Sequence, residues 1–272
     1  MRQTAPLSEK TGILLAAFGS SSPVGARTLS AFEDKLRAVF PLIPVRWAFT
    51  SEHIRSQLED RRIKSDSVAK AVSRMSHEKF THIAIQPLHL ISGLEYAVLC
   101  REAEATAKRV GVTVSLGLPL LHSPDDVART GRALVGSLPQ DRASGDFVVF
   151  MGHGTHHQGD TGYGHLAEYI AGQDARVRLG TMEGAFSLES VLAFLEEAKA
   201  QKVWLLPLLS VVGTHARHDM AGDHPESWKS RIAALGVECQ PVLVGTAECP
   251  GCIDIWIEHA AEAFRSLASR GK

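Results

Sequence analysis

Two histidines and a glutamate each lie just beyond a segment that has the apolar character of a buried strand. His153 follows such a segment directly, and Glu183 and His215 each follow another within a few residues. If the three segments are parallel neighbours in one sheet, these side chains meet at its carboxyl edge, where open α/β sheets bind ligands. Imidazole and carboxylate are ligands of divalent metals such as Co²⁺, Ni²⁺, Zn²⁺ and Fe²⁺. The spacing therefore predicts a divalent-metal site built from His153, Glu183 and His215.

Glycines accompany both histidines. His153 stands between Gly152 and Gly154, and Gly213 lies two residues before His215. Glycine lets a backbone or a ligand approach closely, so these positions favour a binding role. Taken singly, a histidine after a strand is commonly a packed or capping residue, and Glu183 fits an early-helix carboxylate favoured by the helix dipole. The three residues together favour a ligand set.

Length and composition limit the classes of function. The chain has 272 residues, 44% of them hydrophobic and 6% aromatic, which allows one large or two ordinary domains with mostly aliphatic cores. A formal net charge of -1 argues against a broad nucleic-acid footprint. No apolar run approaches the length of a membrane span, and residues 1–10 lack the apolar middle of a signal peptide. We therefore expect a cytoplasmic protein, although a chain whose signal had been removed would look the same.

The cysteines do not form a disulfide framework at this chain length. Cys249 and Cys252 have the Cys-x-x-Cys spacing of metal or redox sites. A thioredoxin-type site would place this motif after an early strand, and a zinc site would need a second pair of ligands close by. We interpret the pair as reduced thiols in a loop, without a role in turnover.

Short aliphatic runs alternate with amphipathic stretches along the whole chain, which is typical of β-α units around a parallel sheet. The runs are nearly continuous in apolar character, as strands covered on both faces require. The predicted strands are 12–18, 45–49, 81–88, 112–116, 146–151, 176–180, 202–208 and 238–244. Each half of the chain thus holds four of them.

Helix signals lie between these strands. Ser123 followed by Pro124 predicts an N-cap and a first helical residue, and Ser187 opens another helix. Residues 95–109 form a further predicted helix that ends before a glycine. The last one, about 253–268, has one apolar side, and such a terminal helix often packs back across a neighbouring domain.

The two halves resemble each other. The matching segments are 13–20 with 148–155, 45–52 with 177–183, and 87–95 with 207–215. The second match aligns Thr50 with Thr181, and the third places Glu95 opposite His215. Three matches in the same order favour an internal duplication. We therefore expect two similar α/β domains, residues 1–139 and 140–272, with a cleft between them. The terminal helix is expected to pack back on the first domain.

Other residues carry weaker signals. The glycine-rich stretch 159–164 has the wrong spacing for a dinucleotide fingerprint. The serines 20–22 lack a nucleophile elbow and are better interpreted as anion or backbone donors. The remaining histidines of the second half are expected to be solvated or to orient a ligand imidazole: His156, His157, His165, His218 and His224.

Several motifs together resemble the anaerobic cobalt chelatases of the CbiK family, which belong to the class II tetrapyrrole chelatases. The motifs are Gly152-His153-Gly154-Thr155, Gly180-Thr181-Met182-Glu183-Gly184, Gly213-Thr214-His215-Ala216-Arg217-His218-Asp219-Met220, Ala17-Phe18-Gly19-Ser20, Phe49-Thr50-Ser51, Pro87-Leu88-His89 with Gly93-Leu94-Glu95-Tyr96, and Asp223-His224-Pro225-Glu226-Ser227-Trp228-Lys229. The resemblance covers almost the whole chain in order.

The resemblance implies a fold, a site and a reaction. The fold is bilobal α/β, with two similar halves that each contain a four-stranded parallel sheet, and the tetrapyrrole lies in the cleft. His153, Glu183 and His215 match the residues that hold the metal, and Glu95 matches an acidic residue facing it from the other half. The implied reaction inserts Co²⁺, as a substrate, into sirohydrochlorin in the oxygen-independent route to cobalamin, without ATP or another nucleotide.

This chemistry needs ligands and bases together. The hydrated ion must lose water, and two pyrrole protons must leave the ring. Three protein ligands leave coordination positions open for the ring nitrogens, and histidine binds metal as the neutral imidazole. We hypothesise that His153 is both a ligand and a proton acceptor, and that Glu95 accepts or relays the second proton.

Alternatives and partners remain open at this point. Sirohydrochlorin is rich in carboxylates, for which Arg46, Arg55, Arg217 and the 20–22 amides are candidate donors. Insertion of Fe²⁺ to give sirohaem fits the same ligands, because their affinity order permits either metal. A non-catalytic metal or tetrapyrrole carrier and a two-domain solute-binding protein are further alternatives. We expect no nucleic-acid or membrane partner, and the chain could form a homo-oligomer.

Overall fold

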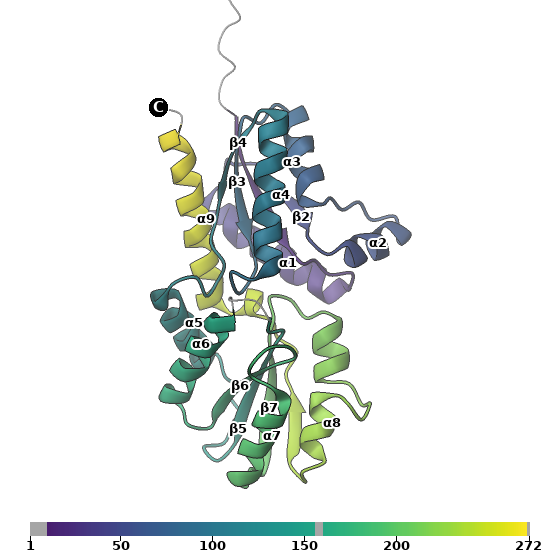
Figure 1. The fold of residues 1–272 in the computed structure, drawn as a ribbon, viewed down its shortest axis with the longest axis vertical. Coiled ribbons are helices and arrows are strands. Elements are labelled where there is room, and N and C mark those ends of the chain that lie inside the picture. Colours follow the sequence, from purple (N-terminus) through teal and green to yellow (C-terminus); the bar gives the residue numbers. More distant parts are fainter. Residues whose placement is uncertain (1–9, 156–159, 271–272) are drawn as a thin grey trace, which may run out of the picture.

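A computed structural model describes residues 10–155 and 160–270. Within them the strands form two four-stranded parallel sheets, one in each half of the chain (Figure 1). The first sheet contains β1 (Thr11–Ala17), β2 (Val45–Phe49), β3 (His82–Pro87) and β4 (Thr113–Leu116). The second contains β5 (Phe147–Gly152), β6 (Val177–Thr181), β7 (Lys202–Leu208) and β8 (Glu238–Pro241). The predicted bilobal α/β fold is confirmed, and all eight predicted strands are present.

The two sheets share one topology. Their strand orders are β2-β1-β3-β4 and β6-β5-β7-β8, so β5 takes the place of β1 in the second sheet. The register agrees as well, because Ala16 pairs with Pro87 and Met151 pairs with Pro207. Equal order and equal register support the internal duplication.

The register corrects one detail of the predicted alignment. Ala17 pairs with Phe49, and the equivalent Gly152 pairs with Thr181. Phe49, not Thr50, is therefore the counterpart of Thr181. Segment 45–52 is one residue longer than segment 177–183, so the two align only with a gap of one residue. The sequence comparison placed this gap inside β2, before Thr50, whereas the register places it after Phe49, the last residue of β2.

Helices cover the faces of both sheets (Figure 1). In the described chain they are α1 (Pro23–Val39), α2 (Glu52–Asp60), α3 (Val68–His77), α4 (Leu94–Val110), α5 (Pro124–Gly136), α6 (Asp160–Gln173), α7 (Leu188–Glu197), α8 (Trp228–Ala233) and α9 (Pro250–Arg270), with a π-helix at His215–Met220 and a 3-10 helix at Thr246–Glu248. As predicted, Ser123 caps α5 and Ser187 caps α7 through their side chains. None of the described helices combines the length and the apolar character needed to cross a bilayer.

Alternating strand residues fill separate cores. In β1, Leu14 and Ala16 belong to one apolar cluster, and Ile13 and Leu15 belong to another, all of them fully buried. This alternation is the period of two that a strand imposes on its side chains. The cluster around Ile13 continues through Trp256 into the second half of the chain. The two sheets are thereby held in one packed body.

The last helix connects the two lobes. α9 packs against β3 and β4 of the first sheet, and its Trp256 meets Phe32 edge to face at 6.1 Å between ring centroids. It begins at Pro250, three residues before the predicted start, because the Pro-Gly pair is accommodated in its first turn. Conversely, α5 packs against α6 and α9. The two lobes therefore interlock through their helices, although each sheet takes its strands from only one half of the chain.

Candidate metal centre

His153 lies in the loop directly after the central strand β5. Its neighbour Gly154 has a φ of +78°, and a Cβ placed there would be 1.8 Å from the carbonyl oxygen of Glu183. The Glu183 amide donates a hydrogen bond of 2.9 Å to the carbonyl of His153. Glycine therefore allows the loops after β5 and β6 to lie against each other, which fixes the backbones of two predicted ligands side by side.

Alanine at Gly154 is expected to damage both stability and the metal centre. It would require a left-handed backbone and would collide with the Glu183 carbonyl, so we expect a loss on the order of 2 kcal/mol or more in the free energy of unfolding. Urea denaturation and Co²⁺ titration check this. Gly136→Ala is the matched control, since a Cβ at Gly136 meets nothing within 4 Å. Equal stability of the two variants would contradict the assigned role of Gly154.

His215 opens a short π-helix, a geometry that is frequent at functional sites. Its Nδ1 donates to Asp219 Oδ2 at 2.6 Å, which leaves Nε2 with a lone pair for a metal. His218 Nδ1 donates to the other oxygen of the same carboxylate at 2.9 Å. Partial burial raises the pKa of Asp219, but the hydrogen bonds from His218 and His215 outweigh it and hold that pKa below its usual range. Asp219 is therefore ionised and orients His215.

The structure brings His153 and His215 together. Their ring centroids are 5.2 Å apart and the rings are nearly perpendicular, at 85°. Both side chains are only partly buried, so a cation and its remaining water can reach them. The β5–β7 pairing explains this contact, because the two strands are neighbours and end at the same edge.

Glu183 is placed beside this pair by its backbone, and its side chain is exposed. Thr181 Oγ1 donates to the Glu183 carbonyl at 2.7 Å and holds the turn. Within the described residues, the set that brings three donor atoms within 4.8 Å of one another is His218, Asp219 and His224, not the predicted triad. The assignment of Glu183 as the third ligand stays a prediction.

Glu95 lies in the first turn of α4, at the carboxyl edge of the first sheet. Loss of water raises the pKa of Glu95, although its side chain is 58% exposed, and the charges of His153 and His215 act in the opposite direction. Glu95 therefore interacts electrostatically with both imidazoles of the other lobe. A carboxylate whose pKa is raised is a better proton acceptor at neutral pH.

His89 is a residue of this region to which the sequence assigned no role. Burial lowers the pKa of His89 to about 4, so it is neutral at pH 7. Its Nε2 is 3.7 Å from Glu95 Oε2, too long for a hydrogen bond, and within the described residues neither ring nitrogen has a hydrogen-bond partner. The contact with Glu95 is therefore not an ion pair at neutral pH. The only sequence signal was its place in the Pro87-Leu88-His89 motif.

His89 is expected to make the fold sensitive to acid. The folded chain keeps His89 neutral down to about pH 4, whereas the unfolded chain binds a proton near pH 6.5, so its contribution is lost as pH falls through this window. The full loss of stability is on the order of 3 kcal/mol. The test compares urea unfolding of the wild type with His89→Leu between pH 4 and 7. Parallel stability curves for the two would contradict this account.

Several other predicted residues have local partners. Arg46 forms an ion pair of 2.9 Å with Glu78, and Arg55 donates to the carbonyls of Phe49 and Thr50. Both arginines therefore bind residues of the first lobe, whereas Arg217 is exposed on the π-helix. Of the weaker histidines, two fall outside the described residues: His156 and His157.

The cysteine pair lies in a helix start and not in an open loop. Cys252 is in the first turn of α9 and Cys249 directly precedes it, and both thiols are free and buried. A hydrogen bond from Cys252 lowers the pKa of Cys249 to about 6. The prediction of reduced thiols holds, and the loop assignment was wrong because Pro250 begins the helix.

Comparison with known sequences gives a consistent result. The profile of the cobalt chelatase family CbiK matches residues 11–265. The sirohydrochlorin cobaltochelatase CbiKC of Nitratidesulfovibrio vulgaris is 47% identical over 267 residues, covering 98% of this chain and 94% of that protein. The sirohydrochlorin cobaltochelatase of Salmonella typhimurium is 32% identical over 257 residues, covering 94% and 97%.

Solved structures share the fold. SirB from Bacillus subtilis with Fe³⁺ superposes with a TM-score of 0.67 at 17% identity, covering 97% of this chain and 98% of that one. CbiX, described as the terminal enzyme for biosynthesis of siroheme in denitrifying bacteria, gives 0.59 at 16% identity, covering 93% and 99%. These likenesses show the bilobal architecture. With a profile match over almost its whole length and two relatives above 30% identity, the chain belongs to the cobalt chelatase family CbiK.

Proposed function

We propose that this protein inserts Co²⁺ into sirohydrochlorin without ATP, in the anaerobic route to cobalamin. The proposal is supported by the close approach of His153 and His215 in one lobe and by their electrostatic interaction with Glu95 of the other, in a chain of the cobalt chelatase family. Two imidazoles supply metal ligands, and a carboxylate with a raised pKa supplies a base. The two relatives described above are both named as sirohydrochlorin cobaltochelatases.

The metal-binding role falls to His153, Glu183 and His215. Asp219 fixes the tautomer of His215, so that Nε2 is free to bind Co²⁺. Three protein ligands leave the ion partly hydrated, and the open positions accept ring nitrogens one at a time as water leaves. The carboxylate of Glu183 is exposed and can turn toward the ion without disturbing the packed turn that carries it.

Two protons must leave the pyrrole nitrogens as the ring takes up the metal. In this proposal His153 accepts one after it releases the ion, and Glu95 accepts the other from the opposite lobe. Both groups are partly exposed, so the protons can pass on to solvent. The reaction exchanges two protons for one divalent cation and is balanced without a nucleotide.

The same proposal covers setting and organisation. We place the protein in the cytoplasm, with sirohydrochlorin as its partner and without a nucleic-acid or membrane partner. A homo-oligomer is compatible with this proposal. We keep the domain boundary at residues 139 and 140, with α9 returning from the second domain to pack on the first.

Metal competition tests the choice of cobalt. We expect kcat/KM for Co²⁺ insertion to exceed the value for Fe²⁺ under anaerobic conditions, measured by absorbance with equal free-metal concentrations. A clear preference for Fe²⁺ would instead support a sirohaem-forming ferrochelatase. If the protein inserts neither metal, the proposal is contradicted.

A further inference from the structure

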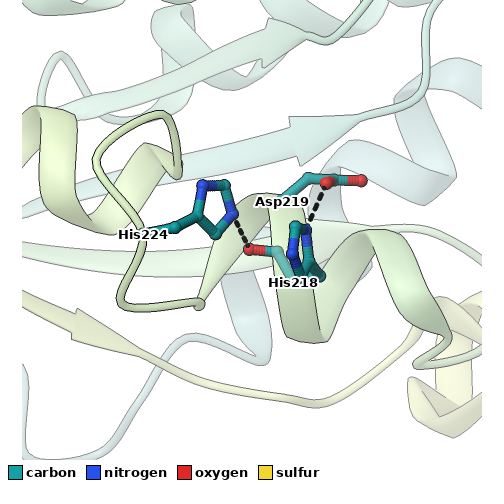
Figure 2. Close-up of side chains that lie close together, drawn as sticks. All are labelled: His218, Asp219 and His224. Carbon is teal, nitrogen blue, oxygen red and sulfur yellow. Dashed lines mark hydrogen bonds and ion pairs between the residues drawn. The ribbon is translucent and has the colours of Figure 1, made fainter.

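Next to the proposed catalytic site, on the exposed side of the π-helix, lies a second group of metal donors. His218, Asp219 and His224 each offer one ligand atom, and these atoms all lie within 4.8 Å of one another (Figure 2). We propose that these residues form a second divalent-cation site, which holds incoming Co²⁺ beside His215. The site itself rests on the geometry below, and its role in supplying cobalt rests on the proposed function.

Hydrogen bonds set the positions of these donors. His218 Nδ1 donates to Asp219 Oδ1 at 2.9 Å, and a cation bound to both atoms would take the place of the proton between them. His224 donates through Nε2 to the carbonyl of His218 at 2.9 Å, which leaves its Nδ1 free. His224 thus has the arrangement by which a metal-binding histidine is usually oriented, with one ring nitrogen donating and the other available.

The two rings are already positioned. Their centroids are 4.2 Å apart and the planes are stacked at 25°. Imidazoles with a carboxylate oxygen suit Co²⁺, Ni²⁺ or Zn²⁺ over Mg²⁺ or Ca²⁺.

The turn that carries His224 depends on Gly222. A Cβ at Gly222 would be 2.3 Å from the carbonyl oxygen of His218 and 3.0 Å from the His224 ring. The Gly222 amide donates to the same carbonyl at 3.1 Å, and Ser227 Oγ donates to the Gly222 carbonyl at 2.6 Å. The backbone thus brings a residue six positions along the chain back onto His218.

Asp219 connects the two sites. One carboxylate oxygen holds His218 and the other holds His215, so a cation at the surface lies on the opposite edge of the carboxylate that orients the catalytic imidazole. His218 is 65% exposed, so the cation reaches it directly from water. An ion held there raises the local concentration of Co²⁺ beside His215 and His153.

Cobalt binding to the protein alone tests this inference. Anaerobic equilibrium dialysis of the untagged protein should find two Co²⁺ per chain for the wild type and one for the double variant His218→Ala/His224→Ala. We also expect the double variant to raise the cobalt KM for insertion by about tenfold, the usual size of a lost supporting contact at a metal site. His77→Ala is the matched control, since it lies at the end of α3, just before β3 begins and so at the opposite edge of the first sheet.

The outcomes separate the two proposals. Equal cobalt stoichiometry in the wild type and the double variant, with both folded by circular dichroism, would overturn the second site. Gly222→Ala keeps all three donors but displaces the turn, and it should also lose the second ion. If instead His153→Ala binds as much cobalt as the wild type while the double variant loses one ion, the second site stands and the proposed catalytic site fails.

Discussion

Alanine at His153 or at His215 is expected to lower the rate of cobalt insertion by a factor on the order of 100 or more. Loss of a supporting residue already costs up to about 100-fold in metal affinity or activity, and these two side chains are the proposed ligands themselves. Both lie at loop or helix starts and are partly exposed, so the cores stay intact. Anaerobic turnover and Co²⁺ affinity, measured on the same preparations, check this result.

The control for these variants is His77→Ala, which removes an imidazole far along the chain from the candidate site, at the end of α3. It should insert cobalt at the wild-type rate. Wild-type activity in either His153→Ala or His215→Ala would remove the site as described. An unfolded variant would be recognised by its circular dichroism, and His→Gln at the same position then repeats the test with a bulkier, polar side chain.

Glutamine at Glu95 is expected to slow turnover by about 100-fold while changing Co²⁺ affinity little. Glutamine keeps the size of the side chain but cannot accept a proton, and a positioned general base contributes at least about this much. Loss of water raises the pKa of Glu95, and its carboxylate interacts electrostatically with His153 and His215. Glu95 is not among the proposed ligands. Separate measurements of kcat and of metal affinity decide between a base and a ligand.

Glu104→Gln is the matched control, because Glu104 is an exposed carboxylate farther along the same helix α4. It should leave kcat and metal affinity near their wild-type values. The reverse pattern for Glu95→Gln, weak cobalt binding with a normal rate once cobalt is saturating, would make Glu95 a metal ligand.

The strands could be predicted because parallel strands buried on both faces need continuous apolar runs. The run 202–208, for example, is β7 without a change at either end. The start of the terminal helix was harder to predict, since its first turn contains Pro250 and Gly251, and this pair of residues is typical of a loop. The one-residue error at Thr50 arose because register depends on backbone pairing, and side-chain similarity cannot fix it to a single residue.

The site was predictable in its residue types and less so in its details. The glycines near His153 and His215 favoured a binding role for both residues, and the structure brings their rings together. The support of His215 by Asp219 depends on a π-helix, whose extra residue per turn has no sequence signature. His89 was missed because its burial, with ring nitrogens that have no hydrogen-bond partner among the described residues, results from packing between distant segments.

The most direct test of the account is the absorbance spectrum of sirohydrochlorin mixed anaerobically with Co²⁺, with and without the protein and without ATP. The account predicts that catalytic amounts of protein accelerate conversion of the free-ring spectrum to that of the cobalt complex, and that His153→Ala does not. Tight binding of cobalt and sirohydrochlorin with no acceleration of the spectral change would contradict it and show a carrier in place of an enzyme.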